Sequence, residues 1–220
     1  MTPIKTLATA LCGLAVTACG PLNENNVGKG ALQAVSGMLP GRADPAPATA
    51  APVVTRAQLD AQPGTVMVVT AYGGASVASM VPAAMNSNRV TWVSADNVSI
   101  TTDNGMIVAT RGFPRDLMAA EVIESRRALA AGGGTSRRIH ETLTGNDQIS
   151  TELLQCSIAP AGAETITIVQ KAYATRRFTE TCKGESIAFT NTYWLGSDGQ
   201  IVRSLQAVSP ETGILQLDRP

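Results

Sequence analysis

The thiol of Cys19 is the side chain whose surroundings most clearly predict a covalent modification. Lys5 is the only charged residue before it, an apolar stretch runs from Leu7 to Val16, and the small residues Thr17 and Ala18 follow. A positive start, a short apolar run and small residues at a cleavage site are typical of a secretory signal peptide. A membrane-spanning helix needs about 20 apolar residues. The sequence therefore predicts export, with Cys19 at the start of the mature chain.

The place of Cys19 directly after these small residues resembles the bacterial lipobox. The resemblance implies cleavage after Ala18, diacylglycerol on the thiol and an acyl chain on the new amino terminus. Two or three acyl chains hold a protein on a membrane far more firmly than one. Gly20 stands where an aspartate retains bacterial lipoproteins at the inner membrane, so the resemblance favours the outer membrane, facing the periplasm. An ordinary signal peptide with an incidental cysteine is the alternative.

Two of the other cysteines, Cys156 and Cys182, belong to the mature chain, whereas Cys12 lies in the signal segment. A pair of cysteines in an oxidising compartment predicts a disulfide. Closing a loop of about 26 residues stabilises a fold by roughly 3.5 kcal/mol in the chain-entropy treatment. A nucleophilic cysteine assisted by His140 is the alternative, and it would require a thiol kept reduced outside the cytoplasm.

Acid–base and metal chemistry have few candidates. His140 is the only histidine, so a metal site built from several histidines is excluded. No Gly-x-Ser-x-Gly motif is present, and nothing in the sequence brings two carboxylates together for glycoside hydrolysis. We expect no catalytic residue, no metal and no cofactor other than the covalent lipid on Cys19, with His140 as an ordinary hydrogen-bonded residue.

Arginine and aromatic residues recur in or beside the strand-like runs. Planar guanidinium groups and aromatic rings would suit a groove for an anionic polysaccharide, through bidentate pairing and stacking. The candidate glycan-binding residues are Arg111, Arg137, Arg138, Tyr173, Arg176, Arg177, Trp194 and Arg203. The alternative is a set of solvent-facing strand residues with local acidic partners such as Glu141 and Glu180.

The charge of the chain is close to balanced, with 17 basic and 17 acidic residues. Loss of Lys5 with the signal segment changes this by one unit. A chain this neutral is not built as a general nucleic-acid binder.

The sequence divides into three zones: a lipoprotein signal peptide over 1–18, a tether over 19–55 and a periplasmic β domain over 56–220. In the tether, apolar residues at helical spacing over 27–39 allow a short helix, and an Ala/Pro-rich linker follows over 42–55.

Short β-type runs fill most of the third zone. They are expected over 66–70, 77–81, 89–93, 98–102, 106–110, 139–143, 149–158, 165–177, 178–189, 193–195, 200–208 and 213–217. Asn104-Gly105 between two runs is a strong hairpin signal. Apolar spacing over 116–129 predicts a helix, and three glycines predict a break over 130–135. The expected fold is mainly β, an antiparallel β-sandwich or barrel-like domain with a small helical insertion.

Several ordered motifs resemble the YjbF family of lipoproteins, whose relatives are named for group 4 capsule polysaccharide. They lie at 89–92, 95–98, 105–113, 116–118, 173–177, 182, 189–194, 198–204 and 210–213, and the likeness covers about 55–218 plus the lipobox. The Ala/Pro linker and the glycine run at 132–134 depart from the family pattern as local length variation.

The resemblance implies an outer-membrane lipoprotein with an all-β periplasmic domain, encoded among genes for exopolysaccharide or capsule production. It supplies no catalytic residues. We therefore expect a non-enzymatic accessory factor in polysaccharide secretion or assembly, in contact with export or other outer-membrane proteins, or with an anionic polysaccharide. A structural envelope lipoprotein supporting another outer-membrane protein is the first alternative. A glycan-modifying enzyme using His140 or a carboxylate pair is the second.

Overall fold

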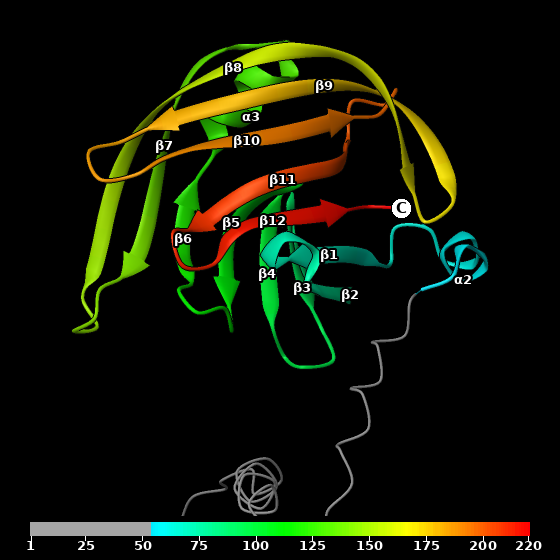
Figure 1. Ribbon diagram of the computed structural model, residues 1–220, viewed down its shortest axis with the longest axis horizontal. Coiled ribbons are helices and arrows are strands. Elements are labelled where there is room, and N and C mark those ends of the chain that lie inside the picture. Colours follow the sequence, from blue (N-terminus) through cyan, green and yellow to red (C-terminus); the bar gives the residue numbers. More distant parts are fainter. Residues whose placement is uncertain (1–53) are drawn as a thin grey trace, which may run out of the picture. The chain divides into compact units, whose positions relative to one another are not determined.

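The computed structural model describes residues 54–220, which form twelve β-strands, two α-helices and one 3₁₀ turn (Figure 1). The helices are α2 (Arg56–Ala61) and α3 (Ile123–Ala130), and the 3₁₀ turn is η1 (Tyr72–Gly74). The strands are β1 (Met67–Ala71), β2 (Ser76–Asn86), β3 (Arg89–Val93), β4 (Ser99–Asp103), β5 (Met106–Arg111), β6 (Leu117–Glu121), β7 (Gly134–Leu143), β8 (Ile149–Ile168), β9 (Lys171–Lys183), β10 (Ala188–Leu195), β11 (Ile201–Ser209) and β12 (Gly213–Asp218). The predicted signal peptide, Cys19, the 27–39 helix and nearly all of the linker lie outside the described residues.

All twelve strands belong to one antiparallel sheet, in the order β5-β4-β3-β2-β1-β12-β11-β10-β9-β8-β7-β6. The two strands at the ends of this order, β5 and β6, follow each other in the sequence and lie next to each other, so the sheet curls into a nearly closed barrel. The barrel-like form of the prediction is therefore confirmed, and the sandwich form is not found.

Side chains, rather than a backbone ladder, join β5 to β6. Thr110 Oγ1 donates to Asp116 Oδ1 at 2.8 Å and accepts from the amide of Leu117 at 3.0 Å. The guanidinium of Arg111 donates to the carbonyl oxygens of Leu117 at 3.2 Å and Met118 at 3.4 Å. These contacts satisfy backbone groups that an open edge would leave to solvent.

The core fills the inside of the barrel, because alternate residues of each strand point to the same face. In β1, for example, Met67, Val69 and Ala71 are buried while the residues between them are half-buried. Inward residues of β1, β2, β5 and β12 pack against Val122 and Leu129 at the two ends of α3, so this short helix belongs to the main core.

The β8–β9 hairpin is longer than the barrel wall and bends over the outside of β10 and β11 (Figure 1). A bulge at Pro160–Gly162 interrupts the pairing with β9 where the bend occurs. Beyond it, Ile166 and Ile168 bury themselves against Trp194 and form a second apolar cluster. The predicted strands 149–158, 165–177 and 178–189 are thus wrong in their bounds, since the turns fall at 169–170 and 184–187.

The expected helix over 116–129 is wrong in its first part. Leu117–Glu121 form β6 and pair with β7, and α3 begins only at Ile123. The residues of β6, Leu-Met-Ala-Ala-Glu, are good helix formers. Pairing with β7 and burial of Leu117 in the barrel override that local preference.

Two glycine-containing segments behave as predicted. Asn104 and Gly105 both have positive φ, 49° and 86°, in the β4–β5 hairpin. A Cβ on Gly105 would lie 3.1 Å from the side chain of Ile201, so the turn also packs closely. Gly132 and Gly133 form the break after α3, both with positive φ.

Cys156 and Cys182 form the predicted disulfide, between directly opposite residues of β8 and β9. Both side chains are buried beside Leu154. The bridge holds together the two strands that form the overhanging hairpin.

Replacing both cysteines, Cys156→Ala with Cys182→Ala, should lower the free energy of unfolding by about 3 kcal/mol, because the bridge closes a loop of about 26 residues. Urea unfolding followed by circular dichroism measures this. The native protein with dithiothreitol should unfold at the same urea concentration as the variant. Equal midpoints for the variant and the oxidised native protein would contradict the prediction.

Candidate functional site

The eight residues predicted to bind glycan do not form one surface. Arg111 lies at the β5–β6 junction, where it bonds to backbone carbonyls. Arg137 points outward from β7 and pairs with Glu124 of α3, with Nη2 to Oε1 at 2.5 Å. Arg138, the next residue, is buried in the barrel. The other five lie on β9, β10 and β11.

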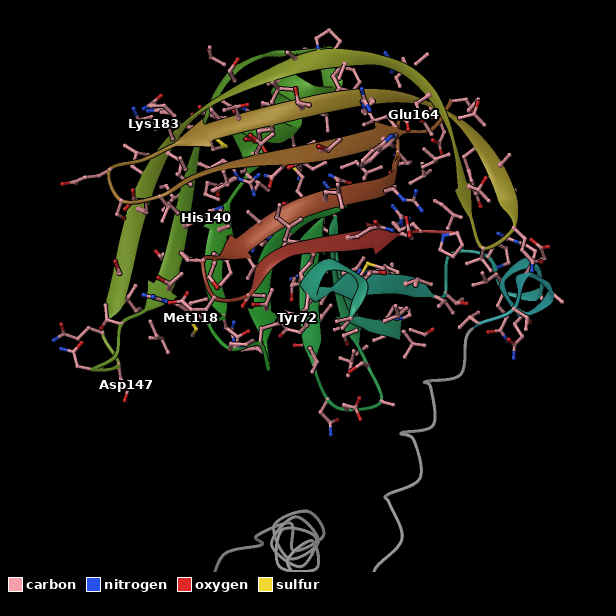
Figure 2. All side chains as sticks on the ribbon, viewed as in Figure 1. Tyr72, Met118, His140, Asp147, Glu164 and Lys183 are labelled. Carbon is pink, nitrogen blue, oxygen red and sulfur yellow. A yellow bond between two sulfur atoms is a disulfide. The ribbon has the colours of Figure 1, made fainter. Side chains whose placement is uncertain are left out.

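A row across three strands contains most of this last group. Trp194 of β10 lies opposite Arg177 of β9 and Arg203 of β11. The carboxylate of Glu164 accepts from Trp194 Nε1 at 3.0 Å and from Arg177 at 3.1 Å. Figure 2 labels Glu164 near the bend of the long hairpin, on the opposite side of the view from Lys183.

This row holds the bent hairpin against the barrel. Arg203 pairs with Asp218 and also donates to the carbonyl of Thr167 in β8, at 3.2 Å. Trp194 is only 8% exposed, so little of its ring is open to a sugar in this conformation. The hydroxyl of Tyr173 accepts a hydrogen bond from Arg56 of α2 at 3.5 Å. The guanidinium of the exposed Arg176 lies over the ring of Phe178. Glycan binding by this group remains a prediction.

A buried polar network crosses the inside of β7, β9 and β10. Arg138 Nη1 donates to Glu180 Oε2 at 2.7 Å and to the hydroxyl of Tyr193 at 3.2 Å. Tyr193 donates to the same carboxylate oxygen at 2.7 Å, and Asn191 Nδ2 does so at 2.8 Å. The Arg138 and Glu180 side chains are 2% and 0% exposed, so this is a closed ion pair.

The charges of this network stabilise each other. Burial alone would raise the pKa of Glu180, but the charge of Arg138 and the hydrogen bonds from Asn191 and Tyr193 outweigh it and hold that pKa below its usual value. Burial, and next the negative charge of Glu180, raises the pKa of Tyr193. Glu180 is therefore ionised and Tyr193 is protonated at neutral pH.

His140 is a core residue of β7, and its Nε2 has no hydrogen-bond partner within residues 54–220, so the expectation of an ordinary hydrogen-bonded residue is not confirmed. It is 2% exposed and its ring stacks on Phe189, with ring centroids 5.2 Å apart. Burial, and next the positive charge of Arg138, lowers its pKa to about 3. Cys156 and Cys182 are joined in the disulfide, so in this structure neither is a free thiol that His140 could activate as a nucleophile. Glu180 lies close to both sulfur atoms, so these three residues could be considered as a metal site. Cysteine binds a metal as the thiolate, however, and the disulfide leaves no thiolate here.

A polar groove runs along α3 and is here called the α3 groove. It consists of two hollows of about 310 Å³ and 480 Å³ that share Arg126 and Arg127. Its polar lining comes from four separate segments: Asn86, Ser87, Asn88, Arg89, Asp103, Asn104, Arg126, Arg127 and Gln200. Apolar side chains of the barrel end, Met106, Leu129, Leu195 and Ile201, form its floor.

The α3 groove has an excess of positive charge. Asp103 is the only acidic residue among the described residues that line it, and it pairs with Arg126 and, at 3.7 Å, with Arg89. Arg127 is exposed and forms no ion pair with any residue of 54–220. The lining thus carries three arginines and one carboxylate, and Arg127 is left free to bind an anion.

Sequence reasoning missed the α3 groove because its residues come from the β2–β3, β4–β5 and β10–β11 turns and from α3. Only the folded barrel brings these turns to one end. The adjacent Arg126 and Arg127, on what was expected to be a helix, were the one local signal.

Breaking the buried ion pair from one side should be costly. Arg138→Met leaves Glu180 charged, buried and unpaired, so we expect a loss of about 3–5 kcal/mol in unfolding free energy. The double variant Arg138→Met with Glu180→Gln should be less destabilised than the sum of the two single variants. Urea unfolding of all four proteins tests this, and additive losses would contradict a coupled pair.

The lowered pKa of His140 makes the stability depend on pH. An unfolded histidine takes up a proton below about pH 6.5, whereas folded His140 does so only near pH 3. Stability is therefore fully present above pH 6.5 and falls as the pH drops toward 3. Between pH 7.5 and 5.0 this group should cost about 2 kcal/mol, and His140→Phe should remove that part of the urea-midpoint shift. An unchanged shift in the variant would contradict the assignment.

Comparison with known proteins agrees with the fold and the family likeness. No curated protein matches the chain. The crystal structure of the hypothetical lipoprotein YmcC from Escherichia coli K12 superposes with a TM-score of 0.66 at 20% identity, over 75% of this chain and 87% of that chain. The family model for "Group 4 capsule polysaccharide lipoprotein gfcB, YjbF" matches residues 5–219. The chain therefore belongs to the YjbF family of group 4 capsule polysaccharide lipoproteins.

Proposed function

We propose that this protein is a lipid-anchored, non-enzymatic accessory factor in the secretion or assembly of an exopolysaccharide or capsule. It holds a segment of anionic polysaccharide in the α3 groove. The observation that carries the proposal is the free guanidinium of Arg127 in an open groove of net positive charge.

The chemistry of the α3 groove supports a glycan ligand. Guanidinium groups bind carboxylate or phosphate oxygens through two parallel hydrogen bonds. The side-chain amides of Asn86, Asn88 and Gln200 supply donors and acceptors for hydroxyl groups. Since the two hollows meet at Arg126 and Arg127, an extended chain of several sugar units suits the site better than a single small molecule.

The place of action follows from the membership of a lipoprotein family and from the lipobox. We propose lipid attachment at Cys19 and, because Gly20 follows it, residence at the outer membrane facing the periplasm. Across 54–220, the structure contains no helix with the length and apolar character needed to span a membrane.

A binding role accounts for the groove better than catalysis does. Glycoside hydrolysis uses two carboxyl groups on either side of the bond, whereas Asp103 is the single acid along the described lining and is engaged by two arginines. His140, the candidate general base, is buried with a pKa near 3. A glycan-modifying enzyme is therefore the weaker alternative.

A structural role beside another outer-membrane protein is favoured by a different observation. Two apolar pairs face outward from the β7–β8 hairpin, Ile139 opposite Leu153 and Leu143 opposite Ile149. Their exposed fractions run from 36% to 64%. Exposed apolar groups of this kind mark contact surfaces when they are contiguous.

Reversing one charge in the α3 groove tests the proposal. The lipid-free chain, with Cys19→Ser, should bind alginate oligosaccharides, which are anionic, and not dextran oligosaccharides, which are neutral. Arg127→Glu should weaken alginate binding at least about tenfold, since a tenfold change needs only 1.4 kcal/mol. Binding should also weaken with salt. Isothermal titration calorimetry gives both values.

Arg176→Glu is the matched control, because Arg176 is also exposed but lies on β9, in the group first predicted to bind glycan. It should leave alginate binding unchanged. In a strain lacking the gene, the native chain should restore surface and released polysaccharide, and Arg127→Glu should not. Loss of alginate binding only in Arg176→Glu would place the site on β9. An unchanged amount of surface and released polysaccharide in the deletion strain would contradict the accessory role.

A further inference from the structure

The sheet is interrupted between β10 and β11. The two strands pair from Leu195 to Thr192 of β10, and the pairing stops there. Ala188–Asn191 of β10 remain paired with β9 on their other side, and Gln206–Ser209 of β11 lie beside β12. Two half-strands therefore face each other without a ladder, and this gap is called the β10–β11 split below. Figure 1 shows the two ribbons diverging from their connecting turn.

The side chain of Asn191 causes the split. Its Oδ1 accepts from the amide of Ala207 at 2.9 Å, the position that a backbone carbonyl of β10 would take in a regular ladder. Its Nδ2 is held by Glu180 and Tyr193 of the buried network, at 2.8 Å and 3.2 Å. Asn191 is 0% exposed, so this insertion is a fixed part of the core.

An apolar groove of about 290 Å³ occupies the split. Its side-chain lining is mainly apolar, from Ile187, Phe189, Val208, Pro210 and Ile214. The rim residue Ile214 is 49% exposed, whereas Val208 at the base is 3% exposed. The volume lies at the lower end of the range for ligand sites and suits a few side chains.

Backbone groups of both half-strands also face this groove. Successive residues of a strand direct their N–H and C=O groups to opposite sides. Since Ala207 directs its N–H toward β10, the opposite residue, Thr190, directs its own groups toward β11, and Ala188 does the same. The register of β10 with β11 ends at Thr192 and Leu205, and beyond it the hydrogen bond from Ala207 to Asn191 crosses the split.

We propose that the β10–β11 split binds an extended polypeptide segment of a partner protein by strand addition along the Ala188–Asn191 edge of β10. The unpaired backbone groups need both donors and acceptors, and a peptide backbone supplies them in register. The apolar lining takes every second side chain of the added segment. An acyl chain would fill the apolar space but leave these backbone groups without partners.

The proposal specifies the chemistry of the partner. The segment is extended, apolar at alternate residues toward the groove and polar at the others. Its affinity depends on its own backbone N–H groups. Sequence selection comes from the apolar lining of the groove, including Phe189 and Val208, which accommodates aliphatic side chains.

Peptide binding to the lipid-free chain, with Cys19→Ser, tests the proposal. The probes are two acetylated, fluorescent hexapeptide amides in which Thr alternates with Val or with Leu. At least one should bind saturably by fluorescence anisotropy. Methylation of its backbone nitrogens at alternate residues should weaken binding at least tenfold in one of the two registers, because strand addition uses those N–H groups. Laurate serves as the acyl-chain probe and should not compete.

Two variants locate the site. Ala188→Pro removes a groove-facing N–H at the first residue of a strand, where proline is tolerated, and Ile214→Asp puts a charge on the rim. Both should weaken the peptide at least tenfold while leaving the melting temperature close to that of the native protein. Val77→Asp is the matched control, at a residue of β2 that is 50% exposed, and should have no effect.

Three results would overturn the proposal. They are the absence of saturable binding by both peptides, equal binding of the methylated and unmethylated forms in both registers, and displacement of the peptide by laurate. Equal loss of binding in Val77→Asp would show that the peptide adheres to exposed apolar residues in general. None of these results depends on a polysaccharide, so the glycan role in the α3 groove is tested separately.

Discussion

The ion pair between Arg138 and Glu180 is the interaction on which the rest of the barrel depends. A guanidinium and a carboxylate have been taken out of water together, which costs several kcal/mol per ion unless both are paired and hydrogen-bonded. Tyr193 and Asn191 donate two further hydrogen bonds to Oε2 of the carboxylate, so these four side chains fix the relative positions of β7, β9 and β10. Asn191 then transmits this constraint to β11, where it replaces a backbone partner and opens the sheet.

Local signals in the sequence predicted the local parts of the fold. Asn104-Gly105 specified a hairpin through positive φ, and the cysteine pair specified a cross-strand bridge. The helix expected from residue 116 onward failed where Leu117–Glu121 pair with a strand far along the chain. The local sequence of residues 117–121 does not indicate that they pair with β7. Their strand conformation is decided by that pairing in the folded sheet.

The candidate sites divide in the same way. Arg137 and Arg138 are adjacent, yet one points outward to Glu124 and the other into the core. The expected strand began at residue 139, two residues too late to assign both arginines to opposite faces. The α3 groove could not be predicted at all, because its turns meet only when the barrel forms. Most arginines of the described residues bond to carboxylates or carbonyls, whereas Arg127 forms no ion pair and lines the α3 groove.

The pairing of β1 with β12 has a consequence for the order in which the emerging chain can fold. The first strand of the domain lies between β2 and the last strand, with Val69 opposite Leu217. Within residues 54–220 this is the only backbone ladder between β1–β5 and the rest of the sheet, because side chains make the contact between β5 and β6. A chain that emerges amino terminus first must therefore wait for its final residues before the barrel wall is continuous. Until then, β1 presents an open edge, and the rate at which the chain emerges sets how long that edge is exposed to other chains.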